Sequence, residues 1–204
     1  MNYILIGRGK MGSLIRETAQ AAGDEIQAAF DINDIDQLGK LGKVADVVID
    51  FSRPGSLPEV ASYVRRTGTP LLSGTTGLSQ TDHALLESLG AFAPVLWSAN
   101  YSLGVAVLYR ALAAVSGVLS PDFDIELTET HHNQKADAPS GTAKLLLEAI
   151  DPARALTPVY GREGNTGQRR KEEIGVHALR GGTVAGTHTV HFFGPDEELE
   201  FTHR

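Results

Sequence analysis

The sequence NYILIGRGKMG, residues 2–12, decides the fold of the first part of this chain. Its apolar run is typical of a short buried strand, its glycines have the spacing G-x-G-x-x-G, and a helical pattern follows through Ala22. A strand, this spacing and a helix together predict a dinucleotide-binding turn, in which the backbone approaches a pyrophosphate and the helix start faces its charge. A glycine-rich turn without a ligand is the simpler alternative.

The next apolar segment, residues 25–30, is expected to be the second strand, and it ends at Asp31, 19 residues after Gly12. A carboxylate at this distance accepts hydrogen bonds from the ribose hydroxyls of a bound dinucleotide. Asp31 is therefore a candidate cofactor ligand. No Arg or Lys follows it directly, because the next residues are Ile32 and Asn33.

The first hundred residues continue to alternate between apolar runs typical of parallel strands and segments with helix-start signals. Strands are expected at 44–50, 70–73 and 94–97, and helices at 56–67 and 79–89. The helix at 56–67 is expected to begin with a capping box. Repeated strand–helix–strand units predict an α/β domain, with the small residues of the turn at 74–77 on the ligand-binding edge of its sheet.

The sequence ETHHNQKADAPSGTA, residues 129–143, carries the chemistry of the second half. The preceding residues 124–129 alternate polar and apolar, which predicts a strand with one buried face. Ser140 is a good N-cap for a helix over the apolar run 142–150. The free N–H groups of Gly141 and Thr142 would then point at solvent or at a ligand carboxylate.

Three side chains able to carry or move a proton, His131, His132 and Lys135, lie within five residues of this stretch. Histidine titrates near pH 6.5 when unperturbed, so one of the pair is a candidate general acid. Lysine can steer a carboxylate or supply a second proton. Each of the three could instead be an ordinary polar residue. No metal site is expected, because zinc sites draw on further ligands and the chain has no cysteine.

Composition limits the partners and the compartment. The net charge of −7 argues against a nucleic-acid partner. Without cysteines there is no disulfide framework, so a reducing compartment is allowed. A cytoplasmic protein is expected. No basic segment precedes the first short apolar run, so neither a signal peptide nor a membrane span is expected.

A long apolar helix at 103–119 is expected to carry the chain into a second domain, giving domains at 1–102 and 103–204. The glycine-rich, charged residues 160–171 are typical of an exposed, mobile loop. Strands joined by glycine turns are then expected at 174–179, 186–193 and 197–202. The overall prediction is a Rossmann-like α/β dinucleotide domain followed by an α+β substrate domain with a mostly antiparallel sheet.

Residues 129–143 resemble the signature E-x-H-H-x-x-K-x-D-A-P-S-G-T-A of the 4-hydroxy-tetrahydrodipicolinate reductase family, also called dihydrodipicolinate reductases. Residues 74–77 resemble the family's G-T-T-G turn, and residues 98–104 resemble its A-N-x-S-x-G segment near the nicotinamide. The resemblance implies NAD(P)H-dependent reduction of the hydroxy-tetrahydrodipicolinate precursor to tetrahydrodipicolinate, in lysine and diaminopimelate biosynthesis. It also implies a dicarboxylate substrate and a homotetramer whose second-domain sheets pair between subunits.

Carried over position by position, the resemblance implies that His131 is the general acid, Lys135 a second proton donor and His132 a substrate ligand. Gly141 and Thr142 would hold a substrate carboxylate. The resemblance and the glycine pattern together give a set of cofactor-binding residues. They are Gly7, Arg8, Gly9, Lys10, Met11, Gly12, Asp31, Gly74, Thr75, Thr76, Ser98, Ala99, Asn100 and Tyr101.

In the family an Arg directly after the ribose-binding carboxylate can hold the 2′-phosphate of NADPH. Its absence after Asp31 favours NADH, with Arg8 and Lys10 as the alternative phosphate ligands. Family members also continue into a C-terminal helix that packs on the dinucleotide domain, whereas this sequence stops at Arg204. If that helix is missing, apolar surface on the first domain is expected to be exposed.

Two other functions remain open at this point. Another two-domain nicotinamide reductase, such as an amino-acid or semialdehyde dehydrogenase, would share the pattern of the first hundred residues but has no need of H-H-x-x-K followed by P-S-G-T. A dinucleotide-binding sensor would bind NADH tightly without oxidising it, and the presence of both His131 and Lys135 argues against it.

Overall fold

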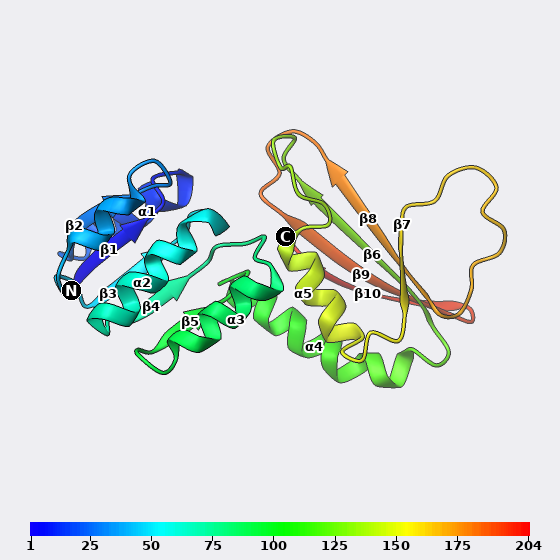
Figure 1. Ribbon diagram of the computed structural model, residues 1–204. Helices are drawn as coiled ribbons and strands as arrows, with labels where there is room; N and C mark the ends of the chain where they lie inside the picture. Colours follow the sequence, from blue (N-terminus) through cyan, green and yellow to red (C-terminus); the bar gives the residue numbers. More distant parts are fainter. The chain divides into compact units, whose positions relative to one another are not determined.

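The computed structural model describes residues 1–204, which form two compact units, Met1–Ala99 and Asn100–Arg204 (Figure 1). Each unit has its own five-stranded sheet and its own hydrophobic core. No helix in the chain combines the length and the apolar character needed to cross a membrane.

The first unit is a parallel sheet with helices between its strands, as the sequence predicts. Its strands lie in the order β2-β1-β3-β4-β5. They are β1 (Asn2–Ile6), β2 (Glu25–Phe30), β3 (Val47–Asp50), β4 (Leu71–Ser73) and β5 (Val95–Trp97). The helices are α1 (Lys10–Ala21), the 3₁₀ helices η1 (Ile35–Lys40) and η2 (Pro54–Ser56), α2 (Leu57–Thr67) and α3 (Gln80–Leu89). The predicted Rossmann-like fold is confirmed.

This strand order places the glycine turn at the point where a doubly wound sheet binds ligands. From β1 the chain moves outward to β2 on one side, and then returns to β3 on the other side of β1. The turns after β1 and β3 therefore lie next to each other, on the edge formed by the carboxyl ends of the strands. Alternate side chains of β1 point to opposite faces of the sheet. Ile4 and Ile6 belong to the buried cluster that includes residues of α2, while Leu5 lies near Gly12 of α1.

The helix starts in this unit test the capping predictions directly. The predicted start of α3 is confirmed as a capping box, because Ser79 accepts from the backbone N–H of Asp82 and the Asp82 carboxylate accepts from that of Ser79. The capping box predicted at Ser56 is wrong. Ser56 has a helical conformation at the end of η2, and its buried hydroxyl has no hydrogen-bond partner. The preceding 3₁₀ turn replaces the side-chain cap that the sequence pattern indicates.

The second unit places two helices against one face of a mixed sheet with the order β10-β9-β6-β8-β7 (Figure 1). Its elements are α4 (Leu103–Leu119), β6 (Asp124–His131), α5 (Gly141–Ile150), β7 (Thr157–Tyr160), β8 (Glu173–Arg180), β9 (Thr187–Gly194) and β10 (Glu197–His203). The pairs β10–β9 and β9–β6 are antiparallel, as expected. The pairs β6–β8 and β8–β7 are parallel. The expectation of a mostly antiparallel sheet therefore needs correction, because crossovers through α5 and the long loop return the chain in the same direction.

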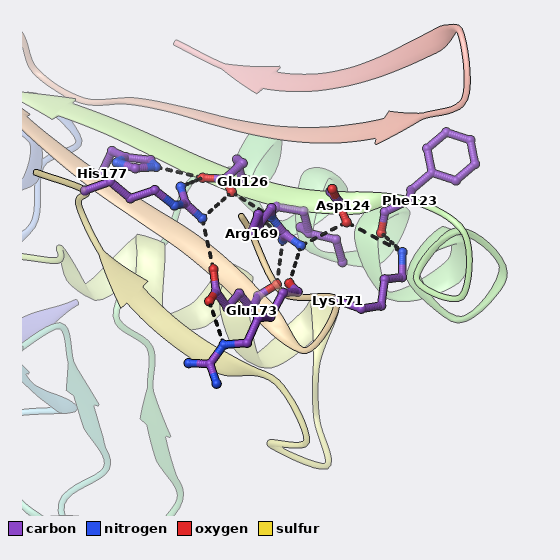
Figure 2. Close-up of polar contacts among 10 residues, drawn as sticks. Phe123, Asp124, Glu126, Arg169, Lys171, Glu173 and His177 are labelled. Atoms are coloured by element: carbon purple, nitrogen blue, oxygen red, sulfur yellow. Dashed lines mark hydrogen bonds and ion pairs between the residues drawn. The ribbon is translucent and has the colours of Figure 1, made fainter. Parts of the chain in front are cut away.

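The long loop before β8 is exposed, as predicted, but arginines fasten its two ends to the sheet (Figure 2). Arg162 donates to both carboxylate oxygens of Glu126 at 2.9 Å, and Arg169 Nε donates to the same carboxylate at 3.2 Å. His177 Nε2 lies 2.7 Å from Glu126 as well. Gly175 is opposite Glu126 on β8, where any Cβ would overlap the carboxylate. The loop is therefore anchored by a charge cluster on the sheet face that α4 and α5 do not cover.

Candidate active site

The site in the second unit is a polar continuation of the core. Alternate residues of β6 are buried, beginning with Ile125 and Leu127 in the core under the helices. The same face continues with Glu129, which is fully buried, and His131, which is 8% exposed. His131 is thus the last residue of the strand rather than a residue beyond it. Two strands place partners next to these residues, because Glu129 pairs with His188 of β9 and His131 with Arg180 of β8.

Glu129 is the centre of this group. Arg180 donates from its two terminal nitrogens to the two carboxylate oxygens, at 3.0 and 2.9 Å. The backbone N–H of Ser140 donates to the same carboxylate at 3.1 Å, and Nδ1 of His131 also hydrogen-bonds with it. Burial would raise the pKa of Glu129, but the hydrogen bonds from Arg180 and His131 outweigh burial and leave the pKa below its ordinary value. Glu129 is therefore ionised at neutral pH.

His188 is a second buried histidine beside the first. Its ring meets that of His131 edge to face, with 5.1 Å between the centroids. Its Nε2 lies 3.0 Å from Oγ of Ser140, and its Nδ1 is buried without a hydrogen-bond partner. Burial, followed by the neighbouring His131, lowers the pKa of His188 to about 4, so the ring is neutral at pH 7.

The start of α5 lies against the same group. Ser140 Oγ accepts from the backbone N–H of Ala143 at 3.1 Å, which confirms the predicted N-cap. Gly141 and Thr142 form the first turn, where backbone N–H groups have no partner within the helix. Asn100 Nδ2 donates to Oγ1 of Thr142 at 2.9 Å. A residue expected near the nicotinamide and one expected near the substrate are therefore in contact.

The other two proton carriers lie in the loop between β6 and α5. Lys135 Nζ lies 2.7 Å from Oδ1 of Asp137, and the Lys135 side chain is 20% exposed. His132 is half-buried and begins a turn in which its carbonyl accepts from the N–H of Lys135 at 3.1 Å. This geometry keeps the ammonium of Lys135 on the loop, within reach of its own Asp137.

The glycine turn of the first unit has the features that a dinucleotide requires. Gly7 has a φ of +104°, and a Cβ there would overlap the carbonyl oxygen of Phe51. A Cβ on Gly12 would overlap the carbonyl oxygen of Gly7, so α1 packs tightly onto the turn. Gly9, at the N-cap of α1, has nothing within 4 Å of its Cβ position. Its backbone is open to a ligand at the helix start, next to the exposed Lys10 and Met11 of the first turn.

Arg8 does not point away as a free cation. It donates to Oδ2 of Asp34 at 2.5 Å and to the carbonyl oxygen of Ala29 at 2.6 Å, and it lies 3.4 Å from Oδ2 of Asp31. Asp34 also accepts from the backbone N–H of Asp31 at 2.8 Å. The edge of the sheet at Asp31 thus presents two carboxylates and one paired guanidinium.

A buried aspartate accepts hydrogen bonds from the turn after β4 and so stabilises it. Asp50, at the end of β3, accepts from Ser52 Oγ at 2.5 Å, from Thr75 Oγ1 at 2.9 Å and from Ser73 Oγ at 3.1 Å. Burial raises the pKa of Asp50 despite these bonds. Thr75 is buried, and its carbonyl oxygen accepts from Trp97 Nε1 at 2.9 Å. Thr75 therefore makes hydrogen bonds inside the unit, whereas Gly74 and the exposed Thr76 lie nearer to solvent.

The remaining predicted cofactor residues lie where the chain passes from β5 to α4. Ser98 continues the pairing of β5 with β4, since its N–H donates to the carbonyl of Ser73 at 3.1 Å. Ser98 and Ala99 belong to the first unit, whereas Asn100 and Tyr101 belong to the second. Asn100 Oδ1 accepts from the N–H of Ser102 at 2.7 Å, which fixes the residue just before α4.

Glu129, His131 and His188 could together be taken for a metal site, because one ligand atom of each lies within 4.8 Å of the others. The hydrogen bonds argue for a different arrangement. Both oxygens of Glu129 already accept from Arg180, so a guanidinium cation occupies the place next to the carboxylate. The absence of a metal stays a prediction from the sequence.

Four buried or paired residues of these sites were missed by sequence reasoning: Glu129, Arg180, His188 and Asp50. Glu129 has a signal, because it has the same parity on β6 as Ile125 and Leu127. Asp50 has a weaker one, as the polar end of an apolar strand. Arg180 and His188 lie on strands far along the chain, and no local pattern connects them to Glu129.

The chain matches the family description "Dihydrodipicolinate reductase, N-terminus" over residues 1–101 and "Dihydrodipicolinate reductase, C-terminus" over residues 104–204. It is 40% identical over 206 residues to a 4-hydroxy-tetrahydrodipicolinate reductase of Exiguobacterium sp. strain AT1b, covering 100% of this chain and 82% of that protein. It is 42% identical over 202 residues to the enzyme of the same name from Campylobacter jejuni, covering 96% and 82%.

Among solved structures, the fold resembles a dipicolinate-bound dihydrodipicolinate reductase from Paenisporosarcina sp. TG-14. The TM-score is 0.68 and the identity 18%, with 100% of this chain and 87% of that chain covered. Both halves match the family description, and the sequence identity extends over the whole length of this chain. This chain therefore belongs to the dihydrodipicolinate reductase family.

Proposed function

We propose that this protein reduces (S)-4-hydroxy-2,3,4,5-tetrahydrodipicolinate to tetrahydrodipicolinate with NADH or NADPH, in the diaminopimelate and lysine biosynthesis pathway. The observation that carries the proposal is His131, which ends β6 on the buried face with Nδ1 on Glu129, beside the start of α5. A histidine in this position can donate a proton to a substrate whose carboxylate rests on the helix start.

The residues of the second unit have separate roles in this reaction. His131 is the general acid, Lys135 a second proton donor and His132 a substrate ligand. The N–H groups of Gly141 and Thr142 bind one carboxylate, supported by the capped start of α5. After loss of water from the substrate, these groups hold the carboxylates and supply the proton that completes the reduction.

The first unit binds the dinucleotide, and the glycine turn supports this proposal. Gly7 and Gly12 bring the strand and helix together, and Gly9 leaves the helix start open to the pyrophosphate. Asp31 binds the ribose, while the backbone of Gly74 and Thr76 and the segment Ser98–Tyr101 contact the cofactor further along. The bound nicotinamide supplies the hydride.

NADH is the preferred cofactor in this proposal. The support is the pairing of Arg8 with Asp34 at 2.5 Å, which occupies the nearest guanidinium and adds a second carboxylate beside Asp31. A 2′-phosphate would meet this excess of negative charge. We expect Asp34→Ala to free Arg8 and raise kcat/KM for NADPH by about 3–10-fold, with little change for NADH. An unchanged ratio would contradict the role given to Arg8.

The assembly is proposed to be a cytoplasmic homotetramer formed through the uncovered face of the second sheet. That face exposes Leu179 of β8 at 50% and Phe193 of β9 at 41%. Apolar side chains at this exposure are typical of surfaces that meet another copy. Light scattering after size-exclusion chromatography measures the mass, and a monomer of 21.8 kDa would overturn the proposal.

The function is tested by the fall in NADH absorbance when freshly generated substrate is added, repeated with NADPH and with His131→Ala. General acid catalysis contributes about 10²–10⁴-fold, so the variant should lose that factor in kcat while its affinity for NADH stays nearly intact. Unchanged turnover in His131→Ala would overturn the assignment of the acid. Tight NADH binding without any oxidation would favour a sensor instead.

A further inference from the structure

We propose that Glu129 and Arg180 are positioning residues that select which ring nitrogen of His131 delivers the proton. Glu129 fixes the tautomer of His131, and Arg180 holds Glu129 in place. This inference rests on the proposed function, because it assumes that His131 is the general acid. It assigns roles to two residues that the predicted site did not contain.

The hydrogen bond from Nδ1 of His131 to Glu129 decides the tautomer. A carboxylate only accepts, so Nδ1 carries a proton in both charge states of the ring. The mobile proton is therefore on Nε2. In the acid step the Nε2–H bond breaks, the proton passes to the reduced substrate, and the imidazole remains neutral with its Nδ1–H on Glu129. Water returns the proton to Nε2 afterwards.

Two neighbours pack around the ring of His131. Gly186, in the turn before β9, faces Nε2, and a Cβ at Gly186 would lie 3.1 Å from it. On the other side, His188 packs edge to face against the ring and is neutral at pH 7. The ring of His131 thus has three neighbours: the Glu129 carboxylate, which it shares with the Arg180 guanidinium, a neutral histidine ring and a glycine.

Arg180 connects this histidine to the loop that carries the second proton donor. Besides its two bonds to Glu129, its Nη2 donates to the carbonyl of Asp137 at 2.6 Å and its Nε to that of Lys135 at 3.3 Å. One planar guanidinium therefore fixes both the acid's partner and the backbone at Lys135. A lysine has no such fork, because its charge is a point on a flexible stem.

A purely structural ion pair is the alternative explanation. Removing one partner of a buried pair is strongly destabilising in either case, so loss of stability does not separate the two. What separates them is dependence on His131. If Glu129 acts through His131, the substitution of Glu129 matters only while the histidine is present.

The experiment compares kcat at saturating substrate for wild type, Glu129→Gln, His131→Ala and the double variant. The amide of Gln can donate to Nδ1 and so favours the wrong tautomer. In enzymes where a carboxylate orients a histidine, this change lowers turnover by up to about 10⁴-fold. We expect a loss of at least about 100-fold for Glu129→Gln, NADH dissociation within 2-fold of wild type, and less than about 2-fold further loss when Glu129→Gln is added to His131→Ala.

Glu126→Gln is the matched control. Glu126 is also an arginine-paired carboxylate of β6, three residues earlier and on the opposite face of the sheet (Figure 2). It should lose stability without loss of kcat. A folded Glu129→Gln with kcat near wild type, or losses that multiply in the double variant, would overturn the positioning role. If His131→Ala itself keeps full turnover, the proposed function fails first.

If Glu129→Gln does not fold, two further measurements test the proposal. Glu129→Asp keeps the charge but shortens the reach, and Arg180→Lys keeps the charge but removes the fork, so each should fold and lower kcat by about 3–30-fold. In the wild type, ¹⁵N shifts of the His131 ring at a pH where it is neutral should show the proton on Nδ1. A proton on Nε2 instead would overturn the proposal.

Discussion

The buried His188 predicts a specific loss of stability in mild acid. Its pKa of about 4 in the folded protein compares with about 6.5 in an unfolded chain. Between these values the unfolded chain binds a proton that the folded protein does not bind, so the free energy of unfolding falls as the pH falls from 6.5 to 4. Above pH 6.5 the histidine is neutral in both states and has no such effect.

The size of the effect follows from the shift. About 2.5 pKa units at 1.36 kcal/mol each give about 3 kcal/mol at pH 4. His188 as a residue is 3% exposed, so solvent screens little of this effect. A loss of about 2–4 kcal/mol is a large part of the stability of a domain of this size.

Urea unfolding followed by circular dichroism, at pH values from 7.5 to 4, measures this dependence in wild type and in His188→Gln. The variant should lose about 2–4 kcal/mol less than wild type over this range, whatever its stability at pH 7.5. His191→Gln is the control, because His191 lies three residues along β9 on the opposite face and pairs with Glu198 at 2.7 Å. Parallel pH dependence in wild type and His188→Gln would refute the reasoning.

Three other predictions concern single residues. Burial would raise the pKa of Glu126, but hydrogen bonds from two arginines and a histidine outweigh it and lower the pKa to about 2. The contribution of Glu126 to stability is therefore present above about pH 4.5 and is lost toward pH 2. Because the side chain is 15% exposed, Glu126→Gln should abolish about 1–3 kcal/mol of acid-induced destabilisation in that window, measured by urea unfolding. Gly7→Ala should destabilise by about 3 kcal/mol or more, because φ is +104° and the Cβ overlaps a backbone oxygen, whereas Gly9→Ala should melt like wild type but raise the KM for NADH. Gly186→Ala should lower kcat by about 10-fold without changing NADH affinity in a fluorescence titration, since its Cβ approaches the acidic nitrogen of His131.

The fold of the first unit could be predicted because its signals are local. Each strand is a short apolar run, each helix has its own start, and right-handed crossovers then leave few possible strand orders. Where a signal depended on the surroundings, the prediction was wrong. Ser56 has the sequence of a capping residue, but the 3₁₀ turn before it already has a helical backbone and buries its hydroxyl.

The second sheet shows the same limit for strand direction. Four of its five strands were predicted, but β7 (Thr157–Tyr160) is short and contains a proline, so it lacks a strand pattern. Whether β8 pairs in parallel with β6 depends on the crossover through α5, which no local pattern records. The motif residues His131 and Lys135 were visible in the sequence, while Arg180 and His188 reach the site only through strand pairing.

The alternation along β6 ties the chemistry to the hydrophobic core. Ile125 and Leu127 are anchored under the helices, and Glu129 and His131 follow at the next two positions of the same face. Deleting Thr128, the one residue between these two pairs, would turn Thr130 inward and leave the acid on the outer surface. A general acid on this strand can therefore face the site only at every second position, and the packing of the core determines which positions those are.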